Sequence, residues 1–309
     1  MRNASELGLA AAFCVLCAVF AIFAPHFFTA DNLLNVSLQA SITAIIAAGM
    51  TFVILTAGID LSVGSVVALS GIVATATLKA GLPLGIGFPL AIVAALAFGA
   101  TSGGIAGLLV ARFSVAPFIV TLALMTVWRG VAFLVTEGRP VWDLPPSFAS
   151  LGSARPLGLP FPTLAMVGVF AVAQVVLAKT RFGRHVVACG GNPEAARLSG
   201  INTKGVVASV YVLCGTLAAM SGVLLAARMN SGQPNAGLMY ELDVIAAVVV
   251  GGTSLSGGRG TIVGTFLGAM LIAVLRNGLN LLDVSSYVQQ VVVGIVILLA
   301  VLFDPVRRN

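Results

Sequence analysis

The chain has 309 residues, of which 59% are hydrophobic and 8% charged, and its formal net charge is +6. Soluble domains carry roughly 25% charged residues, so this composition excludes an ordinary soluble protein and indicates a membrane protein. Long unbroken apolar runs exclude a transmembrane β-barrel, whose strands alternate apolar and polar residues.

The first apolar run, residues 7–24, follows Arg2 and fits either a signal peptide or an uncleaved first helix. No convincing small-x-small cleavage site follows this run, and the rest of the chain is also apolar. We therefore expect an uncleaved first spanning helix.

The apolar runs and polar breaks predict an all-α, polytopic membrane bundle of about ten transmembrane helices, since one crossing needs about 20 residues. We expect a single transmembrane domain over residues 1–309. The predicted spans are residues 8–24, 40–57, 61–78, 89–110, 117–135, 163–178, 206–227, 244–250, 261–275 and 287–303. The eighth of these is far too short to cross a membrane alone.

The basic residues predict the orientation, because positive charge is retained on the cytoplasmic side. With both termini in the cytoplasm, ten of the 16 basic and four of the ten acidic residues fall at inner ends, which places the whole net charge of +6 there. This one-sided charge favours membrane orientation over nucleic-acid binding as the reason for the basic composition.

Two predicted spans carry a glycine at every fourth position. These are Gly99, Gly103 and Gly107 in the fourth span, and Gly260, Gly264 and Gly268 in the ninth. Because lipid gives no hydrophobic drive for helix association, such rows let helix backbones pack closely. The same glycine rows could also serve function, by letting the helices slide past one another during transport.

One carboxylate, Asp60, lies between two apolar runs. At the middle of a spanning helix it would cost about 2.5–3.5 kcal/mol, whereas in the first turn it would gain roughly 0.3–1 kcal/mol from the helix dipole. Residues 40–78 suit two nearly full crossings joined by a tight turn at Gly58, Ile59 and Asp60. Asp60 would then cap a helix starting at Leu61 near the cytoplasmic boundary, with Ser62 as a second cap candidate. A helix cap and a gate or pathway residue are both compatible with this position.

The longest inner loop, residues 179–205, contains the signals of a miniature helix. Asn192 is the expected N-cap, Pro193 the first helical residue, Glu194 the acid of the first turn and Gly200 the left-handed stop. So short a helix is unstable alone. Its apolar edge, Ala195, Leu198 and Ile201 with Arg197 beside it, rests either on the protein's own loops or on a partner.

A second interruption lies at residues 248–264. Residues 244–276 are too few for two full crossings and a loop, so we expect the chain to dip into the membrane here. "GIDLSVG" (58–64) and "GTSLSGG" (252–258) resemble each other weakly, and paired glycine-interrupted segments point to a substrate pathway. Chance similarity between glycine- and serine-rich turns is the alternative. The gate or pathway candidates are therefore Gly58, Asp60, Ser62, Gly252, Ser254 and Ser256.

Three motifs in matching order, "LTAGIDLSVGSVVALSG", "GGNPEAARLSGI" and "VVVGGTSLSGGRGTIVGTFLGAMLIAVLRNGL", resemble the permease subunits of bacterial ribose-type monosaccharide ABC importers. The resemblance extends over most of the chain. It implies a dimer of permeases (identical or paralogous) in the inner membrane, two ATP-binding subunits on the cytoplasmic face, and a periplasmic binding protein that delivers the sugar or polyol.

The resemblance also implies that residues 192–200 form the coupling helix, which inserts into a groove of the ATPase. The coupling residues would be Asn192, Pro193, Glu194, Ala195, Arg197, Leu198 and Gly200. The chain has no Gly-x-x-x-x-Gly-Lys-Ser/Thr phosphate loop. We therefore expect no enzyme activity and no cofactor in this chain, with ATP and magnesium bound by the partner subunit.

A neutral sugar needs hydroxyl, amide and aromatic groups along its path. The pathway candidates within spans are Thr51, Thr126, Trp128, Asn277 and Asn280, and the same reasoning also gives Thr56, Thr121 and Gln290. Each is also explained by a hydrogen bond to a neighbouring helix.

Two other classes of protein remain as alternatives. A secondary transporter or channel without an ATPase would use intramembrane acids and bases as ion relays, but Asp60 is the only acid expected far from the outer boundary and the inner tails. A membrane enzyme lacks support, because no Gly-x-Ser-x-Gly elbow or clustered acid pair occurs. Four cysteines without paired spacing and two histidines predict no metal site.

Overall fold

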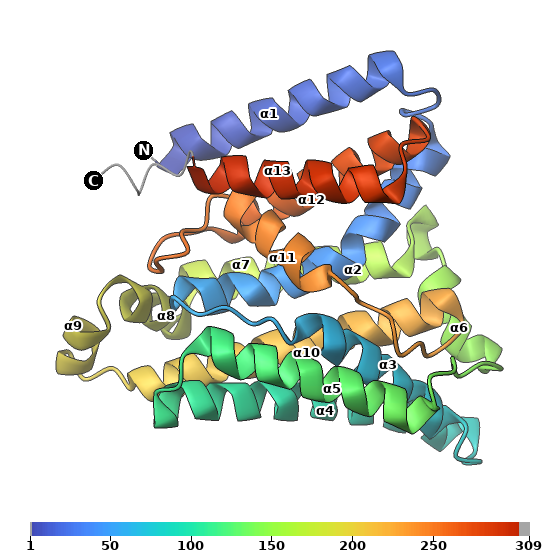
Figure 1. Cartoon of the computed structure of the whole chain (residues 1–309), viewed down its shortest axis with the longest axis horizontal. Coiled ribbons are helices and arrows are strands. Elements are labelled where there is room, and N and C mark those ends of the chain that lie inside the picture. The colour runs from blue at the N-terminus through green and yellow to red at the C-terminus, as the bar shows by residue number, and fades with distance from the viewer. Residues whose placement is uncertain (1, 303–309) are drawn as a thin grey trace.

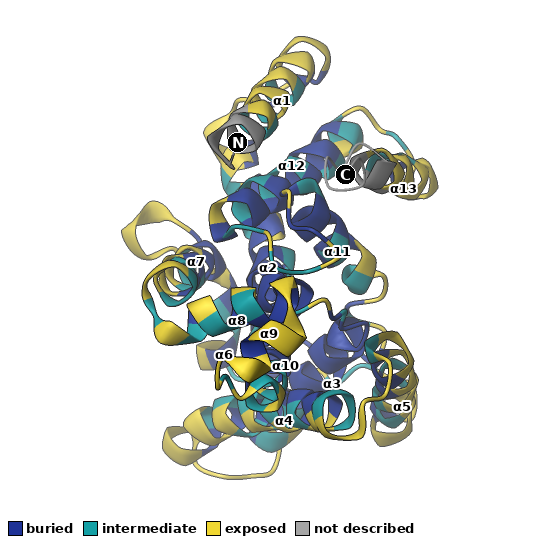
Figure 2. Cartoon of the chain, turned by 90° about the vertical axis from the view of Figure 1, so that its left-hand side faces the viewer, coloured by how far each residue is buried: buried dark blue, intermediate teal, exposed yellow. Residues whose placement is uncertain are grey.

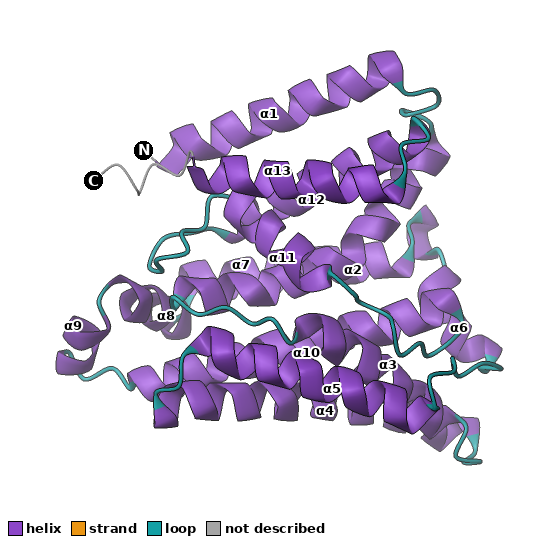
Figure 3. Cartoon of the chain, viewed as in Figure 1, coloured by secondary structure: helices purple, strands orange, loops and turns teal. Residues whose placement is uncertain are grey.

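The computed structural model describes residues 2–302, which form thirteen α-helices and one short 3₁₀ helix (Pro156–Gly158) without a strand (Figure 3). In chain order the helices are α1 (Arg2–Phe23), α2 (Ala30–Leu55), α3 (Val63–Leu78), α4 (Leu84–Phe113), α5 (Pro117–Thr136), α6 (Pro146–Ser153), α7 (Phe161–Lys179), α8 (Arg181–Gly191), α9 (Pro193–Leu198), α10 (Thr203–Met229), α11 (Tyr240–Val250), α12 (Ile262–Leu281) and α13 (Ser286–Leu302).

The long helices lie side by side along one direction, as in a membrane bundle (Figure 1). Among the described residues, α2, α4, α5, α7, α10 and α12 are long and apolar enough to cross a membrane, and α1, α3 and α13 add shorter apolar segments. All ten predicted spans correspond to helices, which confirms the all-α polytopic bundle. The last predicted residue, Phe303, lies outside the described residues, as do Asp304, Arg307 and Arg308.

The beginning of α1, the end of α13, and α8 and α9 all lie at the same end of the bundle (left in Figure 1). We call this the inner end, because the charge distribution predicts it to be cytoplasmic. The opposite, outer end carries α6 and the loop that follows α3.

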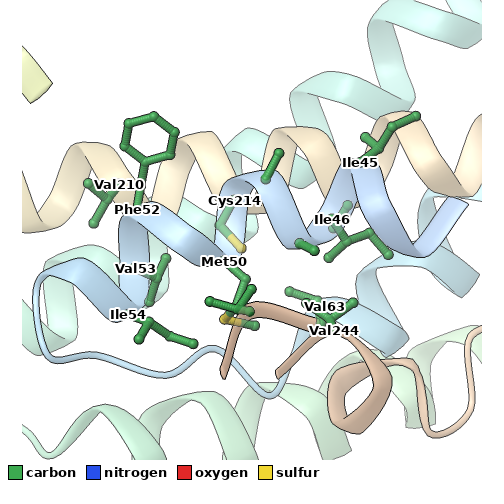
Figure 4. Packing of buried hydrophobic residues seen from close by; sticks show 14 of the residues in the cluster. Ile45, Ile46, Met50, Phe52, Val53, Ile54, Val63, Val210, Cys214 and Val244 are labelled. Atoms are coloured by element: carbon green, nitrogen blue, oxygen red, sulfur yellow. The ribbon is translucent and has the colours of Figure 1, made fainter. Parts of the chain in front are cut away.

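The centre of the bundle is α2, which packs against α7, α10, α11 and α12. Every residue from 44 to 55 is buried, and the side chains of Ile45, Ile46 and Met50 lie within one continuous apolar cluster (Figure 4). A helix that is apolar all round is stable within a protein core or in lipid, and here other helices enclose α2. Viewed from the inner end, buried helices occupy the middle and exposed faces the periphery (Figure 2).

The first glycine row joins α4 to α10 as predicted. A Cβ at Gly103 would lie 2.1 Å from the carbonyl oxygen of Tyr211, and one at Gly99 would lie 2.3 Å from that of Gly215. Only glycine allows this backbone approach, which provides the close packing that lipid cannot drive.

The second glycine row is only partly correct. Within α12, a Cβ at Gly268 would lie 2.1 Å from the carbonyl oxygen of Ala247 in α11. A Cβ at Gly264 would lie 2.1 Å from that of Gly251, which follows the end of α11. Gly260 precedes α12 and does not belong to the row.

Two helices span only part of the membrane. α3 has 16 residues and α11 has 11, so they are about 24 Å and 16 Å long, against about 30 Å of hydrocarbon. Non-helical segments complete their crossings: residues 56–62 run from the inner end to the start of α3, and residues 230–239 run from the outer end to the start of α11 (Figure 1).

The two half-helices begin beside each other inside the bundle. A Cβ at Gly64 would lie 2.4 Å from the carbonyl oxygen of Gly237, and one at Gly237 would lie 2.5 Å from that of Gly64. The order of α2 to α5 is thus repeated in the opposite direction by α10 to α13. Such inverted repeats with interrupted helices are typical of transporters.

This arrangement corrects two predictions. The connection after α2 is an extended re-entrant segment rather than a tight turn between two full crossings. The pairing of residues 58–64 with 252–258 is also wrong, because the first segment precedes a half-helix and the second follows one. The repeat of the first segment is residues 230–239. Tight turns at any helix end use similar glycines and serines, which explains the misleading similarity.

Candidate functional site

The miniature helix of the inner loop is α9. The side-chain oxygen of Asn192 accepts hydrogen bonds from the backbone N–H groups of Glu194 (3.1 Å) and Ala195 (2.9 Å). Pro193 is its first residue, and Gly200 follows its end with a φ of 82°. All of the predicted start and stop signals are therefore confirmed.

α9 projects from the inner end with little of its own surface covered (Figure 2). Only Ala196 is buried among its residues, while the apolar side chain of Leu198 is 78% exposed. Ile201 packs against the main core instead of extending an exposed apolar edge. Since one and a half turns are unstable alone, contact with a partner would add stabilisation that the chain itself does not supply.

α9 is attached to the bundle through α8, a helix not expected from the sequence. Thr180 caps its start, accepting a hydrogen bond from the N–H of Gly183 (3.2 Å). Its buried residues recur every three or four positions, including Val186 and Cys189. Burial raises the pKa of the Cys189 thiol, so this cysteine is a packing residue and a poor nucleophile at neutral pH.

The end of α8 meets two distant segments at one place, which we call the inner junction: Leu55, Ala57, Gly190, Gly257 and Gly258. A Cβ at Gly190 would lie 1.7 Å from the carbonyl oxygen of Leu55 and 2.6 Å from the nitrogen of Gly258. The N–H of Gly258 donates to the carbonyl of Leu55 over 2.9 Å. α8, the end of α2 and the loop 251–261 therefore contact one another backbone to backbone.

The re-entrant segment 56–62 leads directly from this junction to Asp60. One carboxylate oxygen of Asp60 accepts from the N–H of Ser62 (2.9 Å) and from its hydroxyl (2.6 Å). The carbonyl of Ile59 accepts from the hydroxyls of Thr121 (3.3 Å) and Tyr211 (3.4 Å). α5 and α10 thus hold the segment that carries the carboxylate.

The cap prediction for Asp60 is only partly correct. α3 begins at Val63, its N-cap is Ser62, and the Ser62 side chain makes no capping hydrogen bond. Asp60 instead forms a turn before the helix, and with 1% of its surface exposed it lies inside the bundle rather than at the cytoplasmic boundary. Gly58 is required for this path, because a Cβ there would lie 2.5 Å from the Tyr211 hydroxyl.

We predict that Asp60→Asn keeps the fold and lowers transport about tenfold. The amide oxygen still accepts from Ser62, but the charge is lost together with the second carboxylate oxygen, which has no hydrogen bond within residues 2–302. Uptake and thermal unfolding of the purified protein measure the two effects. As a comparison, Asp60→Ala removes the turn as well and should cost about 1 kcal/mol of stability. Wild-type uptake by Asp60→Asn would remove the carboxylate from the pathway.

The candidates of the second interruption form a compact turn at the inner end. The N–H of Ser254 donates to the carbonyl of Arg259 (2.9 Å), and the N–H of Ser256 donates to the Ser254 hydroxyl (3.3 Å). Ser254 is buried, whereas Gly252 and Ser256 are exposed. These residues belong next to the inner junction and do not line a central path.

The five pathway candidates are not brought together. Thr51 bonds to Thr265 across α2 and α12 (2.7 Å), and Asn277 pairs with Asn32 (2.9 and 3.0 Å). Both hydrogen bonds join neighbouring helices, which is the alternative explanation that the sequence offered for each pathway candidate.

The other three candidates lie apart from them. Thr126 is exposed and bonds within its own helix, and Asn280 is exposed at the outer end of α12. The Trp128 ring packs edge-on against Phe98 at 5.3 Å, and its buried N–H lacks a partner within residues 2–302.

A cavity of about 270 Å³ lies at the inner end beneath α9. Its lining includes Pro193 of α9, Cys189 of α8, Gly58 of the re-entrant segment and Tyr211 of α10. A displacement of α9 would therefore change the space next to the segment that carries Asp60.

These features, re-entrant half-helices in an inverted repeat and a short projecting helix, are those of a transport protein, and comparison with known proteins agrees. The family model described as the permease component of a branched-chain amino acid transport system matches residues 32–301. The chain belongs to this permease family.

The permease is 50% identical over 294 residues to the ribose import permease of Escherichia coli strain K12, covering 94% of this chain and 90% of the relative. It is 48% identical to the ribose import permease of Bacillus subtilis (94% and 89% covered). It is 38% identical to the L-arabinose transport system permease of Escherichia coli K12 (98% and 92% covered). No solved structure matches the chain. The resemblance to ribose-type importer permeases is confirmed, and the permease is a multi-pass protein of the bacterial inner membrane.

Sequence reasoning missed several residues that shape the site of the permease. Tyr211 looks like an ordinary core aromatic within an apolar span, and nothing nearby in sequence shows that it contacts Gly58 and Ile59. Gly190 gives a weak signal as part of a glycine pair, but its contacts with Leu55 and Gly258 depend on three distant segments.

Proposed function

We propose that the permease is the membrane subunit of an ATP-driven importer that carries a monosaccharide or related polyol into the cytoplasm. The relatives named for ribose and L-arabinose import support this substrate class, since they match over nearly the whole chain. The interior offers hydroxyl and amide groups rather than chains of acids, as a neutral polyol requires.

ATP and magnesium are bound by a separate subunit in this proposal, because the chain has no phosphate loop of its own. The single observation that carries the proposal is the exposed α9 on a helix, α8, that reaches the inner junction. α9 inserts into the ATPase through Glu194, Ala195, Arg197 and Leu198, while Asn192, Pro193 and Gly200 fix its ends.

Movement of the ATPase subunits displaces α9, and α8 carries the displacement to the end of α2 and to the loop 251–261. Both segments contact α8 at Gly190 through backbone atoms, so neither can yield by a side-chain rotation. Residues 56–62 and Asp60 then shift between two arrangements. ATP binds more tightly to the complex in one of these arrangements than in the other. ATP binding therefore shifts the population between outward-open and inward-open states.

A second permease copy or a paralogue completes the membrane part, and a periplasmic binding protein delivers the sugar at the outer end. Two copies of α9, one in each permease, would then engage two ATPase subunits.

The energy source tests the proposal. The proteoliposomes contain the permease, its ATPase and its binding protein. We expect ribose uptake to need ATP on the side of the membrane where the ATPase lies, and to persist when ionophores collapse all ion gradients. A secondary transporter without an ATPase is the competing candidate. Uptake that stops with the ionophores and does not need ATP would select that competitor.

A further inference from the structure

A second, polar cavity of about 310 Å³ lies in the outer half of the bundle, separate from the inner junction. Its polar lining consists of Gln39 and Thr43 of α2, Arg228 of α10, Tyr240 and Asp243 of α11, and Arg276 of α12. Gln39 lies nine residues inside the outer end of α2, which is about 14 Å of helix. The volume is near the lower end of the range of small-molecule sites, about 300–1,000 Å³.

The floor of this outer cavity contains an ion pair. Arg276 donates to the carboxylate of Asp243 at 2.5 Å, and the two side chains are 33% and 12% exposed. Ionised groups within a membrane protein are costly, and two apolar side chains of similar volume would pack there more cheaply. Ionised residues within a membrane protein are often functional, so this pair is a candidate for contact with a ligand.

Several polar groups at this cavity have unused hydrogen-bonding capacity. The Nε of Arg276 is buried and has no partner within residues 2–302. The side chains of Gln39, Arg228 and Tyr240 also make no hydrogen bond to another described residue. Gln39 and Arg228 are exposed and Tyr240 is half-buried, whereas the Nε of Arg276 is buried. Because buried polar groups are normally paired, this Nε beside an open polar space points to a ligand that accepts from it.

A neutral polyol is such a ligand. Its hydroxyls donate to the Asp243 carboxylate and the Gln39 amide oxygen, and accept from the guanidinium and amide N–H groups. The Tyr240 ring adds an apolar face for the C–H groups of a sugar ring. Asp243 and Arg276 neutralise each other, and Arg228 adds one positive charge to the lining, whose N–H groups donate to hydroxyl oxygens.

We propose that this outer cavity is a transit site for the monosaccharide, between its release by the binding protein and its passage to the inner end. The inference rests on the proposed import function and adds the residues that hold the sugar. Gln39 and Tyr240 contact its hydroxyls, and the Asp243–Arg276 pair orients it.

The test uses Gln39→Leu combined with Tyr240→Phe, which preserves the approximate size of both side chains and leaves the ion pair intact. The matched control combines Gln174→Leu on α7 with Tyr287→Phe on α13, neither of which lines the cavity. Ribose uptake and ATP hydrolysis are measured together in proteoliposomes with the ATPase and the ribose-loaded binding protein.

We expect the cavity variant to import at least fivefold less ribose per ATP hydrolysed, with binding-protein-stimulated hydrolysis and thermal unfolding close to wild type. The control variant should keep the wild-type ratio. An unchanged ratio in the cavity variant would overturn the transit site while leaving ATP-driven import intact. Absence of ATP-driven uptake, by the wild type, of the sugar that its binding protein delivers would overturn the proposed function, and the transit site with it.

Discussion

Replacing Gly190 by alanine should abolish ATP-driven uptake, reducing it at least twentyfold. The new Cβ would lie 1.7 Å from the carbonyl oxygen of Leu55 and 2.6 Å from the nitrogen of Gly258, and both are backbone atoms that cannot rotate away. α8 must therefore move off the end of α2, and overpacking of this kind typically costs about 1–3 kcal/mol. Uptake in proteoliposomes and the thermal unfolding temperature in detergent measure the two consequences.

The neighbouring Gly191 provides a matched control for this variant. Nothing lies within 4 Å of the position that its Cβ would occupy. Gly191→Ala adds the same methyl group to the same helix, where alanine is favoured over glycine by about 1 kcal/mol. Its uptake should equal that of the wild type. Equal activity of the two variants would show that the inner junction is not tightly packed and does not transmit movement.

Replacing Glu194, Arg197 and Leu198 together by alanine should weaken binding of the ATPase at least tenfold, equivalent to about 1.4 kcal/mol. All three side chains are exposed on α9, so their removal subtracts contacts with the partner and leaves the bundle unchanged. Asn192 and Gly200 remain, and they keep the ends of the helix. Pull-down of the ATPase and sugar-stimulated hydrolysis are the measurements.

A triple of the same composition at the outer end controls for loss of charge and apolar surface. Glu137 and Arg139 follow α5 and Leu157 lies in the short 3₁₀ helix, and all three are exposed and far from α9. Their replacement by alanine should leave ATPase binding unchanged. Undiminished binding and coupled hydrolysis by the α9 variant would show that the ATPase docks elsewhere.

The sequence predicted those parts of the fold that depend on local residues. The long apolar runs predicted the membrane-spanning helices, because the length and composition of a segment are enough to identify it as a span. Asn192, Pro193 and Gly200 fix α9 through hydrogen bonds and backbone angles within nine residues. Charge distribution placed α9 and the start of α1 at one end, as Figure 1 shows.

The half-helices were harder to predict, because their boundaries depend on distant backbone contacts. Gly64 meets Gly237 across the bundle, and no local signal identifies residues 230–239 as the repeat of residues 56–62. The visible likeness between residues 58–64 and 252–258 reflected a shared need for tight turns. The ion pair between Asp243 and Arg276 also has no local signal in the sequence, because only the packing of α11 against α12 joins the two residues.

The central claim is that the permease has no energy source of its own and receives it through α9. Sealed vesicles containing the permease alone should not concentrate the labelled sugar that its binding protein delivers above the outside level under any imposed ion gradient. Vesicles that also contain the ATPase, with ATP and the binding protein supplied, should concentrate it. Concentration of that sugar in vesicles that lack the ATPase would contradict the account.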